Sequence, residues 1–204
     1  MASYGMVFDL KRCIGCNACA VACKQENNLP NNVFFTKTLS EEVGQYPKVS
    51  RVYIPTLCNH CEDAPCEWVC PTGATHIRDD GIVMVDEKKC IGCGSCVVAC
   101  PYDVRTLLEP EQLSEGLFKK GEFTEFEKQG NARFVAGTVV KCTFCHERVD
   151  GGLEPACVST CPTSARIFGD LDDPDSSVRR LIQERKGLQP LPEKNTNPKV
   201  YYID

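Results

Sequence analysis

The sequence predicts an α+β protein that is built by duplication and organised around cysteine chemistry. Three observations lead to this prediction. The chain of 204 residues contains 16 cysteines, these cysteines fall into four groups, and the groups alternate between two kinds. Aromatic residues make up only 8% of the chain, so groups bound by the cysteines must replace part of the hydrophobic core. Because such binding supplies folding free energy, we expect the chain to fold poorly without it.

Charge and hydropathy narrow the class of protein. The formal net charge is −5 and no basic stripe is present, so a nucleic-acid partner is not expected. The sequence has no run of about 18 apolar residues, which predicts no membrane span. Only twelve residues precede Cys13, which leaves no room for a secretory signal before the first cysteine group. We therefore expect reduced thiols and not a secreted disulfide scaffold.

The cysteines form four groups of four. Groups one and three share the spacing C-x₂-C-x₂-C-x₃-C, whereas groups two and four place a C-x₂-C pair before two more widely spaced cysteines. In chain order the groups are Cys13, Cys16, Cys19 and Cys23; Cys58, Cys61, Cys66 and Cys70; Cys90, Cys93, Cys96 and Cys100; and Cys142, Cys145, Cys157 and Cys161.

The spacing of groups one and three is the one that bacterial ferredoxins use to hold [4Fe–4S] clusters. A short loop wraps three cysteines around a cluster, and a glycine such as Gly15 or Gly92 allows a positive φ and a close approach. The fourth cysteine opens a helix and ligates the neighbouring cluster. The sequence thus predicts four [4Fe–4S] clusters, which bring the formal charge to about −13 if each cluster with its thiolates carries about −2.

Zinc is the main alternative occupant, because four Cys₄ zinc sites would also use sixteen cysteines. Zinc ribbons, however, space their cysteine pairs well apart. Here Cys13, Cys16 and Cys19 crowd three thiolates into seven residues. This crowding favours the clusters.

The cysteine groups repeat beyond the cysteines themselves. Val-Phe-Asp-Leu-Lys-Arg before Cys13 matches Met-Val-Asp-Glu-Lys-Lys before Cys90, and the Cys-Pro-Thr-Gly-Ala that begins at Cys70 matches the Cys-Pro-Thr-Ser-Ala that begins at Cys161. The pattern A–B–A′–B′ indicates a duplicated two-cluster unit, in which each cluster takes three cysteines from one group and one from a partner group. The residues leave the partner open: adjacent groups could pair, or outer with outer and inner with inner.

Five motifs, present in order, carry a family resemblance. They are Cys13-Ile-Gly-Cys16-Asn-Ala-Cys19, Cys58-Asn-His-Cys61-Glu-Asp-Ala-Pro-Cys66, Val69-Cys70-Pro71-Thr72-Gly73-Ala74, Ala99-Cys100-Pro101-Tyr102-Asp103 and Lys141-Cys142-Thr143-Phe144-Cys145. Over about residues 4–170 the chain resembles the iron–sulfur beta subunits of the dimethyl sulfoxide reductase family. The resemblance implies interlocked ferredoxin-like units, an outer unit of residues 1–57 and 138–170 and an inner unit of residues 58–102. An insertion is expected at 103–137, and local pattern predicts a C-terminal helix and extended tail at 171–204.

The same resemblance implies which cysteines share a cluster. Set 1 would be Cys13, Cys16, Cys19 and Cys161; set 2 Cys23, Cys142, Cys145 and Cys157; set 3 Cys58, Cys61, Cys66 and Cys100; and set 4 Cys70, Cys90, Cys93 and Cys96. Some relatives have tryptophan at the third position of group three and carry a three-iron cluster there. Cys96 stands at that position here, so four cubanes are expected.

Electron transfer is the function that these features predict. The sequence has no phosphate loop and no Ser-His-Asp arrangement, and every cluster would have four protein ligands with no iron open to substrate. The resemblance implies a molybdopterin-containing catalytic subunit at one end, and a membrane quinol-oxidising subunit or a soluble donor at the other. The resemblance fits either export of the chain together with a signal-bearing partner or a cytoplasmic location. The alternatives are a free-standing polyferredoxin, and an enzyme with chemistry at an incompletely ligated cluster.

Some residues outside the cysteines have two interpretations. Lys24 stands where the other groups have proline, and is either solvated at a helix start or a cation that raises the potential of a nearby cluster. His60 and His146 are expected to be exposed or to form hydrogen bonds with cluster sulfur. Trp68 is expected to pack beside a cluster. The phenylalanines of the insertion either anchor a surface excursion or pack on a partner; they are Phe118, Phe123, Phe126 and Phe134.

Local patterns predict the connecting elements. A hairpin is expected over residues 77–86 around Asp80-Gly81, a turn over 45–48 and a short strand over 52–55. A helix is expected over 173–186, with Gly187 as its stop.

Overall fold

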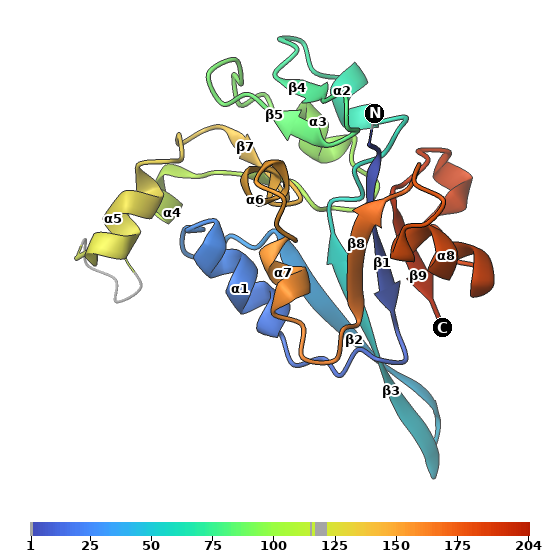
Figure 1. Ribbon diagram of the computed structural model, residues 1–204. Helices are drawn as coiled ribbons and strands as arrows, with labels where there is room; N and C mark the ends of the chain where they lie inside the picture. The colour runs from blue at the N-terminus through green and yellow to red at the C-terminus, as the bar shows by residue number, and fades with distance from the viewer. Residues whose placement is uncertain (1, 115, 117–121) are drawn as a thin grey trace.

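A computed structural model describes residues 2–114, 116 and 122–204 of the chain. Short helices and short strands alternate along it (Figure 1), in agreement with the predicted mixture of helix and strand. A three-stranded sheet in the order β8-β1-β9 lies at one side. Its strands are β1 (Tyr4–Asp9), β8 (Arg166–Asp170) and β9 (Val200–Ile203).

The central strand of this sheet joins the two ends of the chain. Strand β1 pairs with β8 in antiparallel orientation and with β9 in parallel orientation. Met6, Val7 and Phe8 are fully buried, because both faces of β1 are covered, and a strand buried on both faces reads as a continuous apolar run. Helix α1 (Ala18–Glu26) lies beside α7 (Ala156–Ser159) in the same region (Figure 1). Cysteine groups one and four therefore lie side by side.

A long hairpin projects from the body of the molecule (Figure 1). It consists of β2 (Thr36–Gln45) and β3 (Lys48–Leu57), which pair from Thr36 with Leu57 to Gln45 with Lys48. The predicted turn at 45–48 and the predicted strand at 52–55 are confirmed as parts of this hairpin.

The segment that holds cysteine groups two and three forms the upper part of the view in Figure 1. It contains α2 (Pro65–Trp68), β4 (Thr75–Ile77), β5 (Val83–Val85) and α3 (Ser95–Val98). Strands β4 and β5 pair in antiparallel orientation. The predicted hairpin is confirmed: Gly81 has φ +79° and the Asp80 carboxylate accepts the N–H of Ile82 at 3.1 Å.

A two-residue ladder closes the base of the predicted insertion. Strand β6 (Thr106–Leu107) pairs with β7 (Val139–Val140), and α4 (Pro110–Ser114) and α5 (Glu125–Asn131) lie between them. Thr124 caps α5 through a reciprocal hydrogen-bond pair with Glu127. Phe134 packs against the core, Phe126 is exposed, and Phe118 lies outside the described residues.

The C-terminal segment covers the sheet. Helix α8 (Ser177–Glu184) begins after Ser176, whose hydroxyl accepts the N–H of Arg179, and its Val178 packs on Val7 and Ile203. The predicted helix is therefore confirmed over a shorter range. A 3₁₀ turn (Pro192–Lys194) and β9 complete the tail, and α6 (His146–Asp150) follows the C-x₂-C pair of group four. Among the residues that the structure describes, no helix has the length and apolar character to cross a membrane.

Candidate cluster-binding sites

The loops of groups one and three have matching backbone conformations. Gly15 and Gly92 both have φ +68°. A Cβ at Gly15 would overlap the ring of Tyr53, and one at Gly92 would overlap the carbonyl oxygen of Gly137. Glycine is required at both positions because the backbone approaches its neighbour closely in a left-handed conformation.

Set 1 surrounds a small cavity. The cysteines that line this cavity are the four members of set 1, and Arg166 and Thr38 line it beside them. Cys161 reaches the cavity from the segment between α7 and β8, whereas the other three come from the loop before α1 and from α1 itself. Pairing of β1 with β8 brings these distant segments together.

Set 2 surrounds a second cavity, deeper in the molecule. This cavity is again lined by the four cysteines of one set, here together with Met6, Thr36 and Phe144. Cys23, Cys142 and Cys157 are buried, and Cys145 is half-buried. Cysteines from α1, from the C-x₂-C pair of group four and from α7 thus meet at one place.

Set 4 surrounds a third cavity at the opposite end of the molecule. Its four cysteines line this cavity together with Val85 and Val139. Cys70 comes from the loop after α2, while the others come from the segment that contains α3. Helices α2 and α3 pack against each other, which brings the two segments together.

The thiols of set 3 are close enough to interact electrostatically. Burial raises the pKa of the Cys61 thiol to about 12, and the neighbouring Cys58, Cys66 and Cys100 contribute to the rise. These four are the members of set 3. The fold therefore brings the four thiols of sets 1, 2 and 4 each around one cavity, and the grouping of set 3 stays a prediction.

The buried thiols need a positive charge to become ligands. Burial also raises the pKa of the Cys157 thiol to about 11, yet iron binds the thiolate form. Thiols of this kind lose their protons when a metal centre supplies the compensating charge, so that metal binding releases protons. The chemistry of the donor sets fits an iron–sulfur cluster.

Two equivalent loops stabilise thiolates in another way. Slight burial works to raise the pKa of Cys70, but hydrogen bonds from the N–H of Thr75 and the hydroxyl of Thr72 outweigh it and lower the pKa to about 7. The Thr75 N–H lies 3.4 Å from the Cys70 sulfur. In the repeated loop, the N–H of Ala165 donates to the sulfur of Cys161 at 3.3 Å.

The cysteines of a set stand around a space and do not converge on a point. Over residues 2–114, 116 and 122–204, no three His, Cys, Asp or Glu side chains come close enough to hold one metal ion. The three cavities described above each lie at the centre of four thiols.

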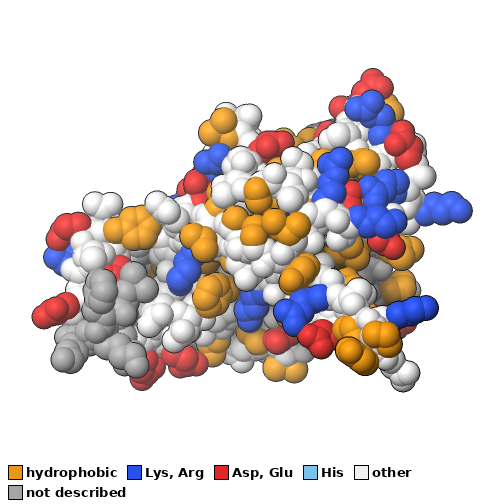
Figure 2. Space-filling model, turned by 90° about the horizontal axis from the view of Figure 1, so that it is seen from below, with side chains coloured by type: hydrophobic (Ala, Val, Ile, Leu, Met, Phe, Trp, Pro, Cys, Tyr) orange, Lys and Arg blue, Asp and Glu red, His pale blue; other side chains and the backbone are white. Residues whose placement is uncertain are grey.

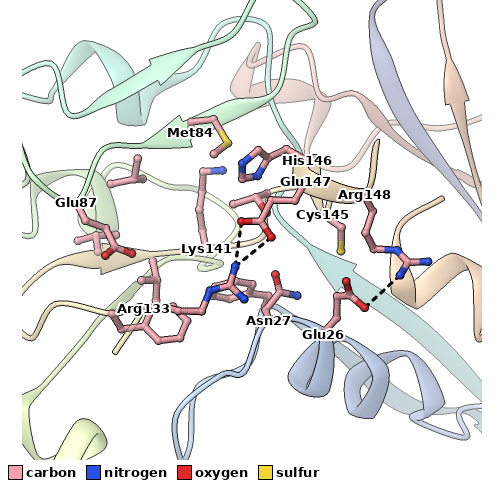
Figure 3. A pocket seen from close by; sticks show the side chains of 16 residues that line it. Glu26, Asn27, Met84, Glu87, Arg133, Lys141, Cys145, His146, Glu147 and Arg148 are labelled. Atoms are coloured by element: carbon pink, nitrogen blue, oxygen red, sulfur yellow. Dashed lines mark hydrogen bonds and ion pairs between the residues drawn. The ribbon is translucent and has the colours of Figure 1, made fainter. Parts of the chain in front are cut away.

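A larger cavity of about 290 Å³ lies beside set 2 (Figure 3). The Cys145 side chain points toward it, and charged side chains surround its mouth. Arg133 pairs with Glu147 at 3.0 Å, and Arg148 pairs with Glu26 at 3.3 Å. These pairs connect the insertion and α1 with α6.

Two interpretations of individual side chains are wrong. Lys24 is not solvated at a helix start: it lies in the last turn of α1, where its ammonium donates to the carbonyl oxygens of Pro30 at 2.7 Å and Leu29 at 3.2 Å. The side chain thereby satisfies carbonyl groups in the segment after the helix. Trp68 does not pack beside a cluster, since it is 69% exposed. It is the last residue of the one-turn helix α2, and its ring reaches solvent.

The two histidines near C-x₂-C pairs are also less exposed than expected. His60 is fully buried and its Nδ1 accepts the N–H of Val83 at 3.0 Å. His146 is half-buried at the cavity of Figure 3, and its Nδ1 has no partner among the described residues.

Three buried cationic residues did not emerge from the sequence. Arg105, Lys141 and Arg166 are at most 5% exposed. Their signal was positional, because Arg105 and Arg166 each stand five residues after the last cysteine of a group and Lys141 directly precedes Cys142. Charged residues at such positions are normally expected to be solvated.

Comparison with protein families agrees with this geometry. One model of a 4Fe-4S dicluster domain matches residues 49–115 and 130–171, and a second of the same description matches residues 12–74. The chain belongs to the 4Fe–4S dicluster family. It shares this membership with iron–sulfur subunits of reductases, and like them it is an electron-transfer subunit.

Individual relatives of this 4Fe–4S dicluster protein cover nearly its whole length. A protein of Halobacterium salinarum assigned as the iron–sulfur subunit of a dimethyl sulfoxide reductase is 46% identical over 100% of this chain and 80% of its own. The arsenate respiratory reductase iron–sulfur subunit of Shewanella sp. is 42% identical, over 98% of this chain and 95% of its own. A tetrathionate reductase subunit of Salmonella typhimurium is 42% identical, over 98% and 72%.

Proposed function

We propose that each of the four cysteine sets holds one [4Fe–4S] cluster, and that the chain relays single electrons between a molybdopterin-containing catalytic subunit and a second redox partner. The observation that carries this proposal is the lining of three cavities: the cysteines around each are the four members of one set. A bound cluster of this type accepts and releases one electron. The protein supplies thiolates, hydrogen bonds to sulfur and burial, which tune the potential.

The packing of the cysteines supports a linear order of the sets. Cys19 of set 1, Cys142 of set 2 and Cys58 of set 3 share one core cluster of buried residues. Cys66 of set 3 and Cys96 of set 4 share another. Set 3 therefore has members in both clusters, which supports its place between sets 1 and 2 on one side and set 4 on the other, as a conduit requires.

The exposure of the thiols supports two ends. Among the sixteen cysteines only Cys16 of set 1 and Cys93 of set 4 are exposed. The loop before α1, which carries Cys16, lies in the lower half of Figure 1, and α3 lies in the upper half. Electrons would enter at one end and leave at the other, while sets 2 and 3 lie in the interior.

Apolar side chains at both ends fit partner proteins. Ile14, which lines the cavity of set 1, is exposed, as are Ile91, which lines the cavity of set 4, and Val98 of α3. Seen from below, hydrophobic side chains gather near the middle of the lower face (Figure 2). Exposed apolar groups next to a redox centre would exclude water when a partner docks.

The interlocked arrangement is part of the same proposal. Pairing of β1 with β8 and packing of α1 on α7 support an outer unit of residues 1–57 and 138–170. Packing of α2 on α3 supports an inner unit of residues 58–102. Arg78, beside the β4–β5 hairpin, donates to Asp150 at the end of α6 with 2.6 and 3.1 Å bonds, which ties the two units together.

The names of the relatives support the choice of partners. Several relatives are named as subunits of arsenate, tetrathionate or polysulfide reductases, which supports a catalytic reductase subunit at one end. The other end would meet a membrane anchor subunit that oxidises quinol, or a soluble donor. Such a complex would assemble on the outer face of the membrane through a signal-bearing partner, or in the cytoplasm.

Metal analysis of the anaerobically purified protein tests the proposal. We expect about sixteen irons and as many acid-labile sulfides per chain, with interacting signals from reduced cubanes in the EPR spectrum. Stoichiometric zinc, or four or fewer irons, would falsify it. Purification from native cells tests the partner: a co-purifying molybdopterin protein is expected, whereas a stable monomer without one would favour a free-standing polyferredoxin.

A further inference from the structure

Three positive charges are buried in the core of this chain. Arg166 is 3% exposed, Lys141 2% and Arg105 5%. A buried charge is costly unless it is paired. Among the described residues, no carboxylate forms an ion pair with any of the three. Some other negative charge must therefore compensate them.

Arg105 lies between set 3 and set 4. Its Nη2 donates to the sulfur of Cys66, a member of set 3, at 2.9 Å. Its Nη1 donates to the hydroxyl of Thr75 at 3.1 Å, and the backbone N–H of Thr75 donates to the sulfur of Cys70, a member of set 4. A guanidinium and one threonine thus link a thiol of each inner set.

Arg166 lies between set 1 and set 2 in the same manner. It lines the cavity of set 1, and its Nη2 donates at 3.0 Å to the hydroxyl of Thr36, which lines the cavity of set 2. The guanidinium also lies over the ring of Phe8 at 4.8 Å. Its Nη1 is buried and has no hydrogen-bond partner within the described chain. A buried donor without a partner in the chain calls for an acceptor from outside it, such as water or a bound group.

Lys141 lies between set 2 and set 3. Its ammonium donates to the carbonyl oxygen of Cys142, a member of set 2, at 2.8 Å, and to the carbonyl oxygen of Val83. Val83 in turn packs in one cluster of buried residues with Cys61 and Cys66 of set 3. Each of the three intervals between successive sets thus contains one buried cation.

We propose that Arg166, Lys141 and Arg105 are fixed counter-charges for the three intervals between neighbouring clusters, and that each raises the reduction potential of the two clusters beside it. This inference rests on the proposed function, because it requires clusters in the four sets. A one-electron transfer would reduce the accepting cluster and oxidise the donating cluster by one electron, with no proton or further reagent. Because each cation lies between two cysteine sets, it would stabilise the added negative charge in either set.

The physical basis is the low dielectric of the interior. A charge buried among apolar residues is little screened by water or salt, so its field at a neighbouring cluster is strong. Reduction adds one negative charge to the cluster, and a nearby cation lowers the free energy of that state. A purely structural role would depend on hydrogen bonds and packing but not on charge.

Redox titration of the holoprotein, followed by EPR, separates these roles. Arg105→Gln removes the charge, and Arg105→Lys keeps it. We expect the Gln variant to lower the reduction potentials of the clusters in sets 3 and 4. The reduced-to-oxidised ratio should fall at least tenfold, which is about 59 mV for a one-electron couple. The Lys variant should lie close to the wild type. Arg166→Gln should lower the reduction potentials of the clusters in sets 1 and 2, and Lys141→Gln those of the clusters in sets 2 and 3.

Exposed cations next to the same cysteines are matched controls. Arg12 directly precedes Cys13 and Lys89 directly precedes Cys90, and their side chains are 59% and 64% exposed. Arg12→Gln and Lys89→Gln remove the same charge at the exposed surface. Screening by water and salt should hold the change in the reduced-to-oxidised ratio below about threefold. Equal shifts in buried and exposed variants, or equal shifts in the Gln and Lys variants of Arg105, would overturn the inference.

A second measurement keeps the inference testable if a buried variant loses its clusters. Wild-type protein labelled with ¹⁵N in the arginine guanidinium should show hyperfine coupling from that nitrogen to reduced clusters, and Arg105→Lys should remove part of it. Absence of coupling in wild type that contains its full iron would contradict the inference alone. Too little iron in wild type would contradict the proposed function instead.

Discussion

The ring of His60 stacks on the ring of Phe144, with their centroids 3.8 Å apart. His60 lies within the C-x₂-C pair of group two, and Phe144 lies within that of group four. The stack therefore joins a loop of set 3 to a loop of set 2. The His60 Nδ1 accepts the N–H of Val83, so the proton of the neutral ring is on Nε2.

We predict that His60→Ala destabilises the protein strongly. The change removes a fully buried ring and leaves the N–H of Val83 without an acceptor, which together should cost about 3–4 kcal/mol. His60→Phe keeps the ring but not the acceptor, and should cost about 1–2 kcal/mol. Denaturant unfolding of the holoprotein measures both. His76→Ala is the control because His76 is exposed, and losses no larger than that of the control would refute the prediction.

Local sequence signals predicted much of the framework. Cysteine spacing is a strict signal because three ligands must fit one cluster within a short loop, and Asp80-Gly81 or the Ser176 cap act within a few residues. The assignment of cysteines to four clusters stays a prediction, which the cavity linings support. The coarser prediction of a 4Fe–4S electron-transfer subunit is confirmed by the family comparison.

Non-local effects account for what the sequence did not predict. The tail was expected to lie extended, but its parallel pairing with β1 depends on segments almost 200 residues apart. The burial of Arg105 and Arg166 depends on thiols and threonines from other segments, and their place five residues after a cysteine does not by itself separate them from solvated arginines. Lys24 likewise binds carbonyl groups that only the turn after α1 brings within reach.

Two glycines of one loop should respond differently to alanine. Gly92 and Gly94 have φ of +68° and +72°, so alanine costs about 1–2 kcal/mol of backbone strain at either. A Cβ at Gly92 would also overlap the Gly137 carbonyl oxygen, whereas nothing lies within 4 Å of one at Gly94. We expect Gly92→Ala to lose the cluster of set 4 and Gly94→Ala to keep it. Iron content and EPR of the two variants decide, and equal behaviour would contradict the proposed steric cause.

An ion pair between the sheet and α8 should give a defined pH dependence. Asp9 is buried and accepts the N–H groups of Lys11 and Arg12 while pairing with Arg185. Burial alone would raise the pKa of Asp9, but Arg185 and the N–H of Arg12 hold it below its ordinary value. The stabilisation is therefore complete above the unfolded pKa of about 3.9 and is lost as the pH falls through the lower folded value.

We expect Asp9→Asn to reduce the free energy of unfolding by about 2 kcal/mol near neutral pH. The difference from wild type should stay constant from about pH 8 to pH 5, because the Asp9 carboxyl is ionised in both states over that range. Urea unfolding of the holoprotein across this range is the measurement. Asp204→Asn, at an exposed ion pair with Lys11, should have little effect. A difference that shrinks steadily between about pH 8 and pH 5 would show that another group is responsible.

Cys161→Ala tests which distant segments share a cluster. Cys161 belongs to group four by sequence, but it lines the cavity of Cys13, Cys16 and Cys19. We expect the substitution to alter or remove the cluster of set 1, with a loss of up to about four irons, and to leave the set 2 signals intact. Cys157→Ala, four residues earlier, should instead disturb set 2. EPR of the two reduced variants distinguishes the sets. If Cys157 and Cys161 ligated the same cluster, both substitutions would disturb the same signal. If both variants lose the same signal, groups one and four do not exchange their last cysteines, and the interlocked arrangement is wrong.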